Sequence, residues 1–200
     1  MMMTSLFRCG VLWVSILASA AWAQSPQSPQ VDPWESFNRK MFGFNESLDQ
    51  AVIRPVAVAY QDHAPVLVQK GVSNFFGNLR DLWSAVNSAL QAKPVHALEN
   101  VGRFLVNTTI GIYGLFDVAT HIGLERHSED FGQTLGVWGV NTGPYVVLPL
   151  FGPSNVRDTV GFGVDLSTDF VLNTGSLNTE SKIAINTLRI INFRANTLDA

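Results

Sequence analysis

The 200-residue chain predicts an all-α fold built as a single domain. Apolar residues recur at spacings of three and four through most of the sequence, which is the period of an amphipathic helix. Prolines and glycines separate these repeats, as expected where one helix ends and the next begins. The chain contains no internal repeat and no composition change that marks a domain boundary, and its length suits one domain.

The first helix is expected from Pro33 to Val52. Asp32 is placed to cap it, with Pro33 at the first helical position and Glu35 as the reciprocal acid. We expect Arg54-Pro55 to end it, because proline disfavours the helical region at the residue before it. The apolar face of this helix is heavily aromatic and needs an apolar partner; it consists of Trp34, Phe37, Met41, Phe44, Leu48 and Val52.

Seven further helices follow from the same periodicity. They are expected at residues 65–76, 78–91, 94–109, 115–121, 129–135, 155–170 and 179–198. The stops between them are turn signals such as Lys93-Pro94.

The segment 141–154 has a different pattern. Turn residues flank an apolar run, and Pro149 interrupts that run, so we interpret the segment as a short hairpin-like apolar loop. Such a run is too apolar for a bare solvent loop. It either plugs the core or forms a flap that contacts lipid, for which the candidates are Tyr145, Leu148, Leu150 and Phe151.

Residues 1–23 are predicted to be a cleaved secretory signal peptide. Arg8 precedes an apolar run from Val11 to Ala21, and Ala21-Trp22-Ala23 suits a signal peptidase. An N-terminal membrane anchor is the alternative, although the run is shorter than the roughly 20 residues that span a bilayer. Residues 24–31 are polar and proline-rich, which predicts a flexible spacer.

The single cysteine, Cys9, precedes the apolar run. It is therefore misplaced for the lipid-accepting cysteine of a bacterial lipoprotein, which follows such a run. We predict a mature chain that is not acylated and has no disulfide.

The composition favours a protein that lies in or against a bilayer. Charged residues make up 14% of the chain and apolar residues 46%, whereas an average soluble domain has about 25% charged residues. A well-packed soluble domain is the alternative. No basic block is present, so nucleic acid is not expected as a partner.

Motifs for catalysis are absent from the sequence. It has no nucleophile elbow and no phosphate-binding loop, and the sequence GFGVDL at 161–166 lacks the third glycine of a dinucleotide fingerprint. The four histidines lack the spacing of a helical zinc site. We therefore predict no enzyme activity, no metal and no cofactor.

Four polar residues stand out within otherwise apolar helices: Asn38, Asn45, Arg103 and Asn107. Buried polar groups need hydrogen-bond partners, so these residues either bond between helices or line a polar passage for lipid. In the second case Arg103 would steer a lipid phosphate, because its planar guanidinium matches phosphate oxygens.

Seven stretches between residues 32 and 165 resemble, in order, the MlaA (VacJ) family of Gram-negative outer-membrane proteins. They are DPWESFNRKMFGFNESLD, IRPVAVAY, VSNFFGNLRD, VNSALQ, RFLVNTTIGIYGLFDVA, DFGQTLGVWGVNTGPYVVLPLFGPSNVRD and GFGVD. The resemblance implies a mostly helical, ring-like protein embedded at the periplasmic side of the outer membrane, with an amphipathic channel.

The function that this resemblance implies is phospholipid transport. Family members remove phospholipid misplaced in the outer leaflet and pass it to a soluble periplasmic carrier, which maintains outer-membrane lipid asymmetry. They work bound to trimeric porins, without covalent chemistry. A porin-associated structural scaffold without a lipid passage is the alternative.

Two departures from the family are visible. Members are usually lipoproteins, and this chain lacks the acylated cysteine. Members also continue into a further helix where this chain stops at Ala200.

Overall fold

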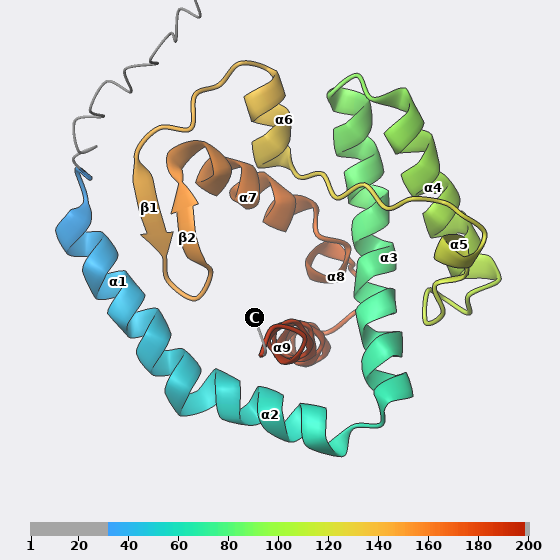
Figure 1. Cartoon of the computed structure of the whole chain (residues 1–200), viewed down its shortest axis with the longest axis horizontal. Coiled ribbons are helices and arrows are strands. Elements are labelled where there is room, and N and C mark those ends of the chain that lie inside the picture. Colours follow the sequence, from blue (N-terminus) through green and yellow to red (C-terminus); the bar gives the residue numbers. More distant parts are fainter. Residues whose placement is uncertain (1–31, 199–200) are drawn as a thin grey trace, which may run out of the picture. The chain divides into compact units, whose positions relative to one another are not determined.

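Helices make up most of the computed structural model, which describes residues 32–198 (Figure 1). The predicted mostly helical, single-domain fold is confirmed. The expected signal peptide (1–23) and spacer (24–31) lie outside the described residues.

The chain continues as a helix through Arg54-Pro55, so the predicted break there is wrong. Helix α1 (Glu35–Leu48) runs into the π-helical turn η1 (Asp49–Ile53), which runs into α2 (Arg54–His63). The amide of Arg54 bonds to the carbonyl of Asp49, five residues back, and Pro55 falls in the first turn of α2. Pro55 has no amide to donate, so the helix passes this position without that bond, directly after the wider π turn.

Helix α1 begins two residues later than expected. Asp32 still serves its start, because Oδ1 of Asp32 accepts from the amide of Trp34 at 2.9 Å. Glu35 does not reciprocate; it accepts instead from Arg39 at 2.8 Å, one turn along the exposed face.

Helix α3 (Val66–Leu90) is one continuous helix where the sequence predicts two. Gly77 sits at the expected break, but it serves close packing: a Cβ there would meet Nη1 of Arg126 at 2.9 Å. Asn78 is buried and donates to the Thr108 hydroxyl at 2.8 Å. Thr108 lies on α4 (Pro94–Thr109), which has the predicted bounds and packs along α3.

The second half of the described chain is made of shorter elements. Strands β1 (Tyr145–Leu148) and β2 (Gly152–Asn155) pair antiparallel with Tyr145 opposite Asn155, so the hairpin-like segment is a true hairpin with Pro149 in its turn. The remaining elements are α5 (Val118–His121), α6 (Phe131–Val137), α7 (Val156–Thr168), α8 (Phe170–Asn173) and α9 (Thr179–Ala195).

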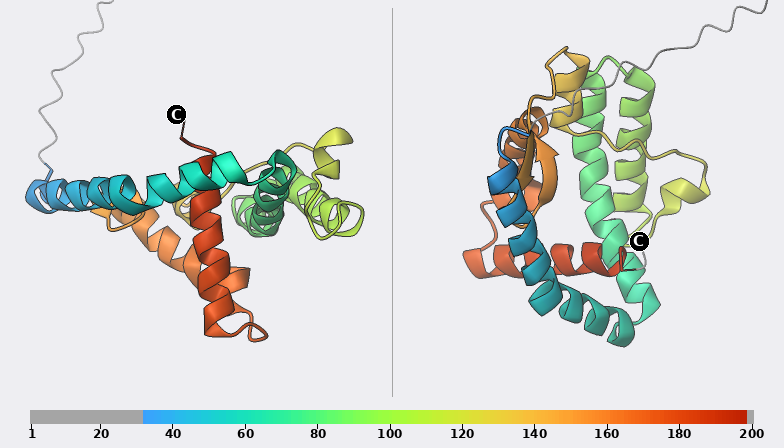
Figure 2. Two further views of the ribbon diagram at one scale, coloured as in Figure 1. Left: turned by 90° about the horizontal axis from the view of Figure 1, so that it is seen from below. Right: turned by 60° about the vertical axis from the view of Figure 1, so that its left-hand side comes forward.

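Contacts between elements close a circuit within residues 32–198. The continuous path α1–α2–α3 is completed by α6, α7 and the hairpin, which returns to α1 (Figure 1). Helix α9 contacts α2, α3 and α8 and is seen end-on inside the circuit. The side view shows α9 projecting from the layer that contains α1, α2 and α3 (Figure 2).

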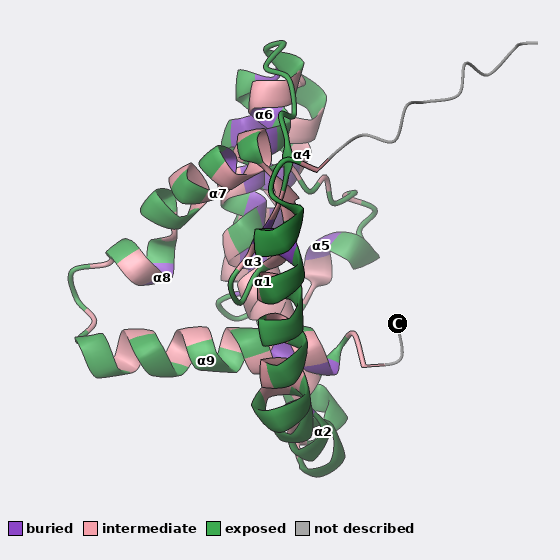
Figure 3. Ribbon diagram, turned by 90° about the vertical axis from the view of Figure 1, so that its left-hand side faces the viewer, coloured by how far each residue is buried: buried purple, intermediate pink, exposed green. Residues whose placement is uncertain are grey.

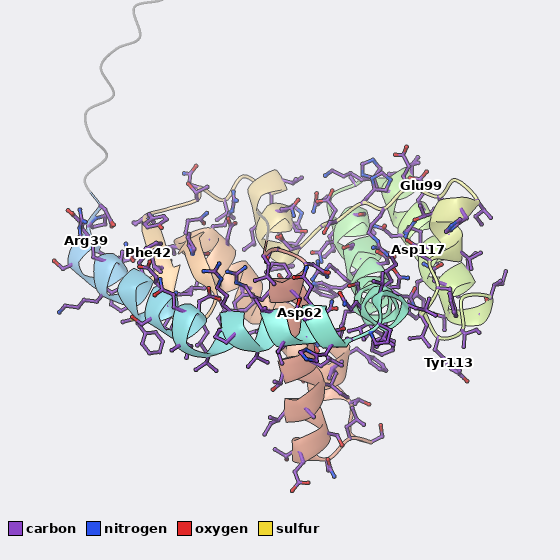
Figure 4. The ribbon with its side chains drawn as sticks, turned by 60° about the horizontal axis from the view of Figure 1, so that its bottom comes forward. Arg39, Phe42, Asp62, Glu99, Tyr113 and Asp117 are labelled. Carbon is purple, nitrogen blue, oxygen red and sulfur yellow. The ribbon has the colours of Figure 1, made fainter. Side chains whose placement is uncertain are left out.

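Burial is inverted relative to a water-soluble domain. Within residues 32–198 the buried apolar residues are small, four alanines and two valines, whereas the buried polar residues include Asn87, Asn100 and Arg103. Helices α1 and α2 are coloured almost wholly as exposed (Figure 3), and large apolar side chains project from them. Phe42 on α1 and Tyr113 after α4 lie at opposite ends of Figure 4 and are 55% and 76% exposed.

An outward-facing apolar surface of this extent marks contact with an apolar partner. None of the helices in the described residues is long and apolar enough to span a membrane.

Candidate functional site

A cavity of about 490 Å³ lies between α3, α7, α8, α9 and the segment 128–130. Its wall is amphipathic. The apolar part consists of Phe76, Leu79, Leu82, Trp83, Val86, Phe162, Leu166, Phe170 and Val171, and the charged part of Arg80, Glu129, Asp130, Asp165, Asp169 and Arg189.

Arg189 of α9 forms an ion pair with Asp169 on the charged part of the wall. Its Nη1 donates to Oδ2 of Asp169 at 2.6 Å, and its guanidinium carbon lies 5.2 Å from the ring centre of Phe76. Burial alone would raise the pKa of Asp169, but the bonds from Arg189 and from the α8 amides that Asp169 caps leave it below its ordinary value. This pair links α3, α8 and α9 at one point.

Asp165 of α7 faces α3 across the cavity. Its Oδ1 accepts from the indole Nε1–H of Trp83 at 2.7 Å and from the amide of Phe131 at 3.1 Å. Burial outweighs these bonds and raises the pKa of the Asp165 carboxyl. Glu129 differs, since its Oε1 accepts from Lys93 at 2.8 Å and its pKa is lowered despite burial.

Arg80 is the cation of the wall that stands free. It is exposed and forms no ion pair or hydrogen bond within residues 32–198. Every other charged group on this wall except Asp130 and Asp165 has an oppositely charged partner.

Two of the predicted polar residues attach α1 to the hairpin. Asn38 donates to the carbonyl of Tyr145 at 3.2 Å and accepts from the amide of Val147 at 2.8 Å. Asn45 repeats the arrangement two turns later, with the Leu148 carbonyl at 2.9 Å and the Leu150 amide at 2.8 Å. Each side-chain amide therefore donates to one hairpin carbonyl and accepts from one hairpin amide, as the backbone of a neighbouring strand would.

The other two, Arg103 and Asn107, lie in a closed polar cluster between α3, α4 and α5. Arg103 is 1% exposed and donates to Asp81, to Thr120 and to both oxygens of Asp117. Asn107 donates to Asp117 at 3.0 Å. Burial would raise the pKa of Asp117, but the bonds from Thr120, Asn107 and Arg103 hold it well below its ordinary value.

The contacts of Arg103 and Asn107 are the interhelical hydrogen bonds that the sequence allows as the alternative to a polar passage. Arg103 has no open face with which to meet a lipid phosphate, because its guanidinium is surrounded by protein acceptors. The contacts of Asn38, Asn45, Arg103 and Asn107 favour the internal hydrogen-bonding alternative, and their assignment to a lipid passage stays a prediction.

The hairpin places its apolar side chains on both sides. Val147 is buried, whereas Tyr145, Leu150 and Phe151 are 45%, 59% and 57% exposed; Leu148 is half-buried. The ring of Phe151 lies 4.6 Å from that of Phe162, which belongs to the cavity wall. The hairpin thus adjoins the cavity.

The cavity residues were not predicted as a site from the sequence. Asp165 belongs to the GFGVDL stretch, which is an incomplete dinucleotide motif and, as GFGVD, part of the family resemblance, but does not mark a lipid site. The sequence feature that could have pointed to Asp165 is a carboxylate on an apolar helix in a chain with few charges. Its partner Trp83 lies 82 positions away, so local spacing does not connect them.

Comparison with known proteins identifies the family. The model of the MlaA lipoprotein family matches residues 30–200. The chain belongs to this family. The resemblance seen in the sequence is thereby confirmed.

Two relatives of the family illustrate the extent of similarity. The intermembrane phospholipid transport system lipoprotein MlaA of Escherichia coli K12 is 38% identical over 193 residues, which cover 94% of this chain and 76% of that protein. An uncharacterised protein of Rickettsia typhi is 42% identical over 147 residues, covering 74% and 55%. The chain spans about half of the length of such Rickettsia relatives.

A solved structure shares the fold. It was described as the structural basis for maintenance of bacterial outer membrane lipid asymmetry, and its chain is 38% identical. The two superpose with a TM-score of 0.72 over 84% of this chain and 85% of that one.

Proposed function

We propose that this protein transports phospholipid at the outer membrane. It removes phospholipid misplaced in the outer leaflet and passes it to a soluble periplasmic carrier, and so maintains lipid asymmetry. The observation that carries the proposal is the amphipathic cavity of about 490 Å³, enclosed in a fold whose large apolar side chains face outward. A phospholipid has the same division into charged and apolar parts as the cavity wall.

The outward apolar surface supports a position in the outer membrane, on its periplasmic side. Such contact is apolar and is little affected by ionic strength, which screens only exposed charges. The protein is therefore expected to fractionate with outer membranes and to resist washing with concentrated salt. Release by salt alone would contradict an embedded protein.

The partners that we propose are a trimeric porin, which holds the protein in the membrane, and the periplasmic carrier. The name of the E. coli relative places that protein in an intermembrane phospholipid transport system, which supports a receiving component. Purification from outer membranes under mild detergent, followed by mass spectrometry of associated proteins and lipids, tests both. Recovery of porin without phospholipid would favour a structural scaffold.

The hairpin is proposed as a flap beside the cavity. Leu150 and Phe151 at its turn are exposed, and Phe151 contacts the cavity wall through Phe162. Gly152 has a φ of 84°, a conformation that glycine adopts without strain, which suits a hinge. Replacement of Leu148 and Leu150 by aspartate is expected to leave the helical circular-dichroism signal intact while outer-leaflet lipid clearance fails. Loss of that signal would instead mark the hairpin as part of the core.

A further inference from the structure

Some of the charged groups on the cavity wall have an oppositely charged partner and others do not. Arg189 is neutralised by Asp169, and Glu129 is paired with Lys93 outside the cavity. The groups left without an opposite charge in the described residues are Arg80, Asp130 and Asp165. The open wall therefore offers one cation and two carboxylates to a bound molecule.

Arg80 and Asp165 are connected through Trp83. Arg80 and Trp83 are three residues apart on α3 and so lie on one face of the helix, and Trp83 holds Asp165 at 2.7 Å. Both hydrogen bonds to Asp165 fall on Oδ1. Its Oδ2 receives none from residues 32–198 and is not sealed from solvent, so it remains available to a donor in the cavity.

We propose that this cavity selects the headgroup of a zwitterionic phospholipid that carries a primary ammonium, with Arg80 against the phosphate and Asp165 against the ammonium. The proposal depends on the lipid-transport function proposed above and specifies its substrate. A guanidinium suits phosphate oxygens, and an ammonium is a compact donor that suits a carboxylate. An anionic headgroup without the ammonium would leave Asp130 and Asp165 facing additional negative charge.

Next to the proposed headgroup position, the apolar part of the cavity wall offers a surface for the acyl chains. Leu82 and Val86 on α3 line the cavity and are 41% and 42% exposed, and Phe170 on α8 also lines it and is 64% exposed. The headgroup is thus held where α3 meets α7, and the apolar wall of α3 and α8 continues from it.

The test compares two short-chain lipids of identical acyl chains, a phosphatidylethanolamine and a phosphatidylglycerol, binding to the whole purified protein in detergent. Native mass spectrometry and calorimetry measure the two affinities. We expect the ethanolamine lipid to bind about tenfold more tightly, which corresponds to about 1.4 kcal/mol. Asp165→Asn should remove that preference by weakening only the ethanolamine lipid, because an amide oxygen still accepts from Trp83 but carries no charge.

A second variant keeps the test independent of the Asp165 contact to Trp83. Arg80→Gln changes an exposed, unpaired side chain and should weaken both lipids by about tenfold. Arg39→Gln, on the exposed face of α1, is the matched control and should change neither.

The outcomes separate the two proposals. Equal binding of both lipids by the unchanged protein, or full affinity in Arg80→Gln, would overturn the headgroup assignment and leave lipid transport standing. Binding of neither lipid would overturn the transport proposal itself.

Discussion

Trp83 of α3 donates its indole N–H to Oδ1 of Asp165 on α7 at 2.7 Å, a bond that joins the two helices across the cavity. The same Oδ1 of Asp165 also accepts from the amide of Phe131 on α6, so one carboxylate links α3, α6 and α7. Asp165 therefore holds this part of the cavity wall in place.

Trp83→Phe is expected to lower the free energy of unfolding by about 1.5–3 kcal/mol, since it removes a hydrogen bond to a charged acceptor. Denaturant unfolding in detergent, followed by near-ultraviolet circular dichroism, measures it. Trp34→Phe serves as the control, because Trp34 is 42% exposed at the start of α1. An equal loss in both variants would show that the indole bond has no specific effect.

Arg103→Met should be among the most destabilising substitutions in the chain. It removes the buried cation of the pair with Asp81 and Asp117 and leaves only the partly exposed Arg126 beside them. Breaking a buried ion pair in this way costs about 3–5 kcal/mol. Arg39→Met breaks the exposed pair with Glu35 and should cost less than about 1 kcal/mol. Comparable melting temperatures for the two variants would contradict the buried-cluster interpretation.

The polar cluster also predicts a pH dependence. The pKa of Asp117 is lowered in the folded protein from an ordinary value of 3.8, so its stabilising effect is present above pH 3.8. That effect is lost as the pH falls through the lower folded value. The stability difference between the unchanged protein and Asp117→Asn should therefore be largest near pH 7 and shrink below pH 3.8. A difference that stays constant from pH 7 to pH 3 would refute the assignment.

Asn38→Ala is expected to loosen the hairpin from α1. The amide of Val147 loses its acceptor and the carbonyl of Tyr145 its donor, each hydrogen bond contributing about 1 kcal/mol. Hydrogen exchange at Val147 should accelerate about tenfold or more, while amides within α4 keep their protection. Unchanged exchange at Val147 would show that the strand pairing alone holds the hairpin.

The sequence predicted best what depends on local spacing. The bounds of α4 follow from Pro94 and the apolar repeat behind it, and the hairpin follows from Pro149 between turn residues. It failed at Arg54-Pro55, where a π turn carries the helix on, and at Gly77, where the glycine makes room for the distant Arg126 within a continuous helix.

Sequence spacing could not predict the hydrogen-bond partners of the polar residues. The sequence identified Arg103 and Asn107 as unusual, yet the acceptor that they share, Asp117, lies in the loop before α5 and looks ordinary in isolation. The cavity charges likewise come from α3, α7 and α9 and meet only after folding.

The most direct test of lipid removal is the amount of phospholipid in the outer leaflet of cells. Cells that lack their own family member are supplied with this chain or with Arg80→Gln, and exposed phospholipid is measured as fatty acid released by externally added phospholipase. We predict that the unchanged chain restores the low release of normal cells and that Arg80→Gln restores it only in part. Release that stays high although the unchanged chain is present in the outer membrane would contradict transport and leave a structural scaffold.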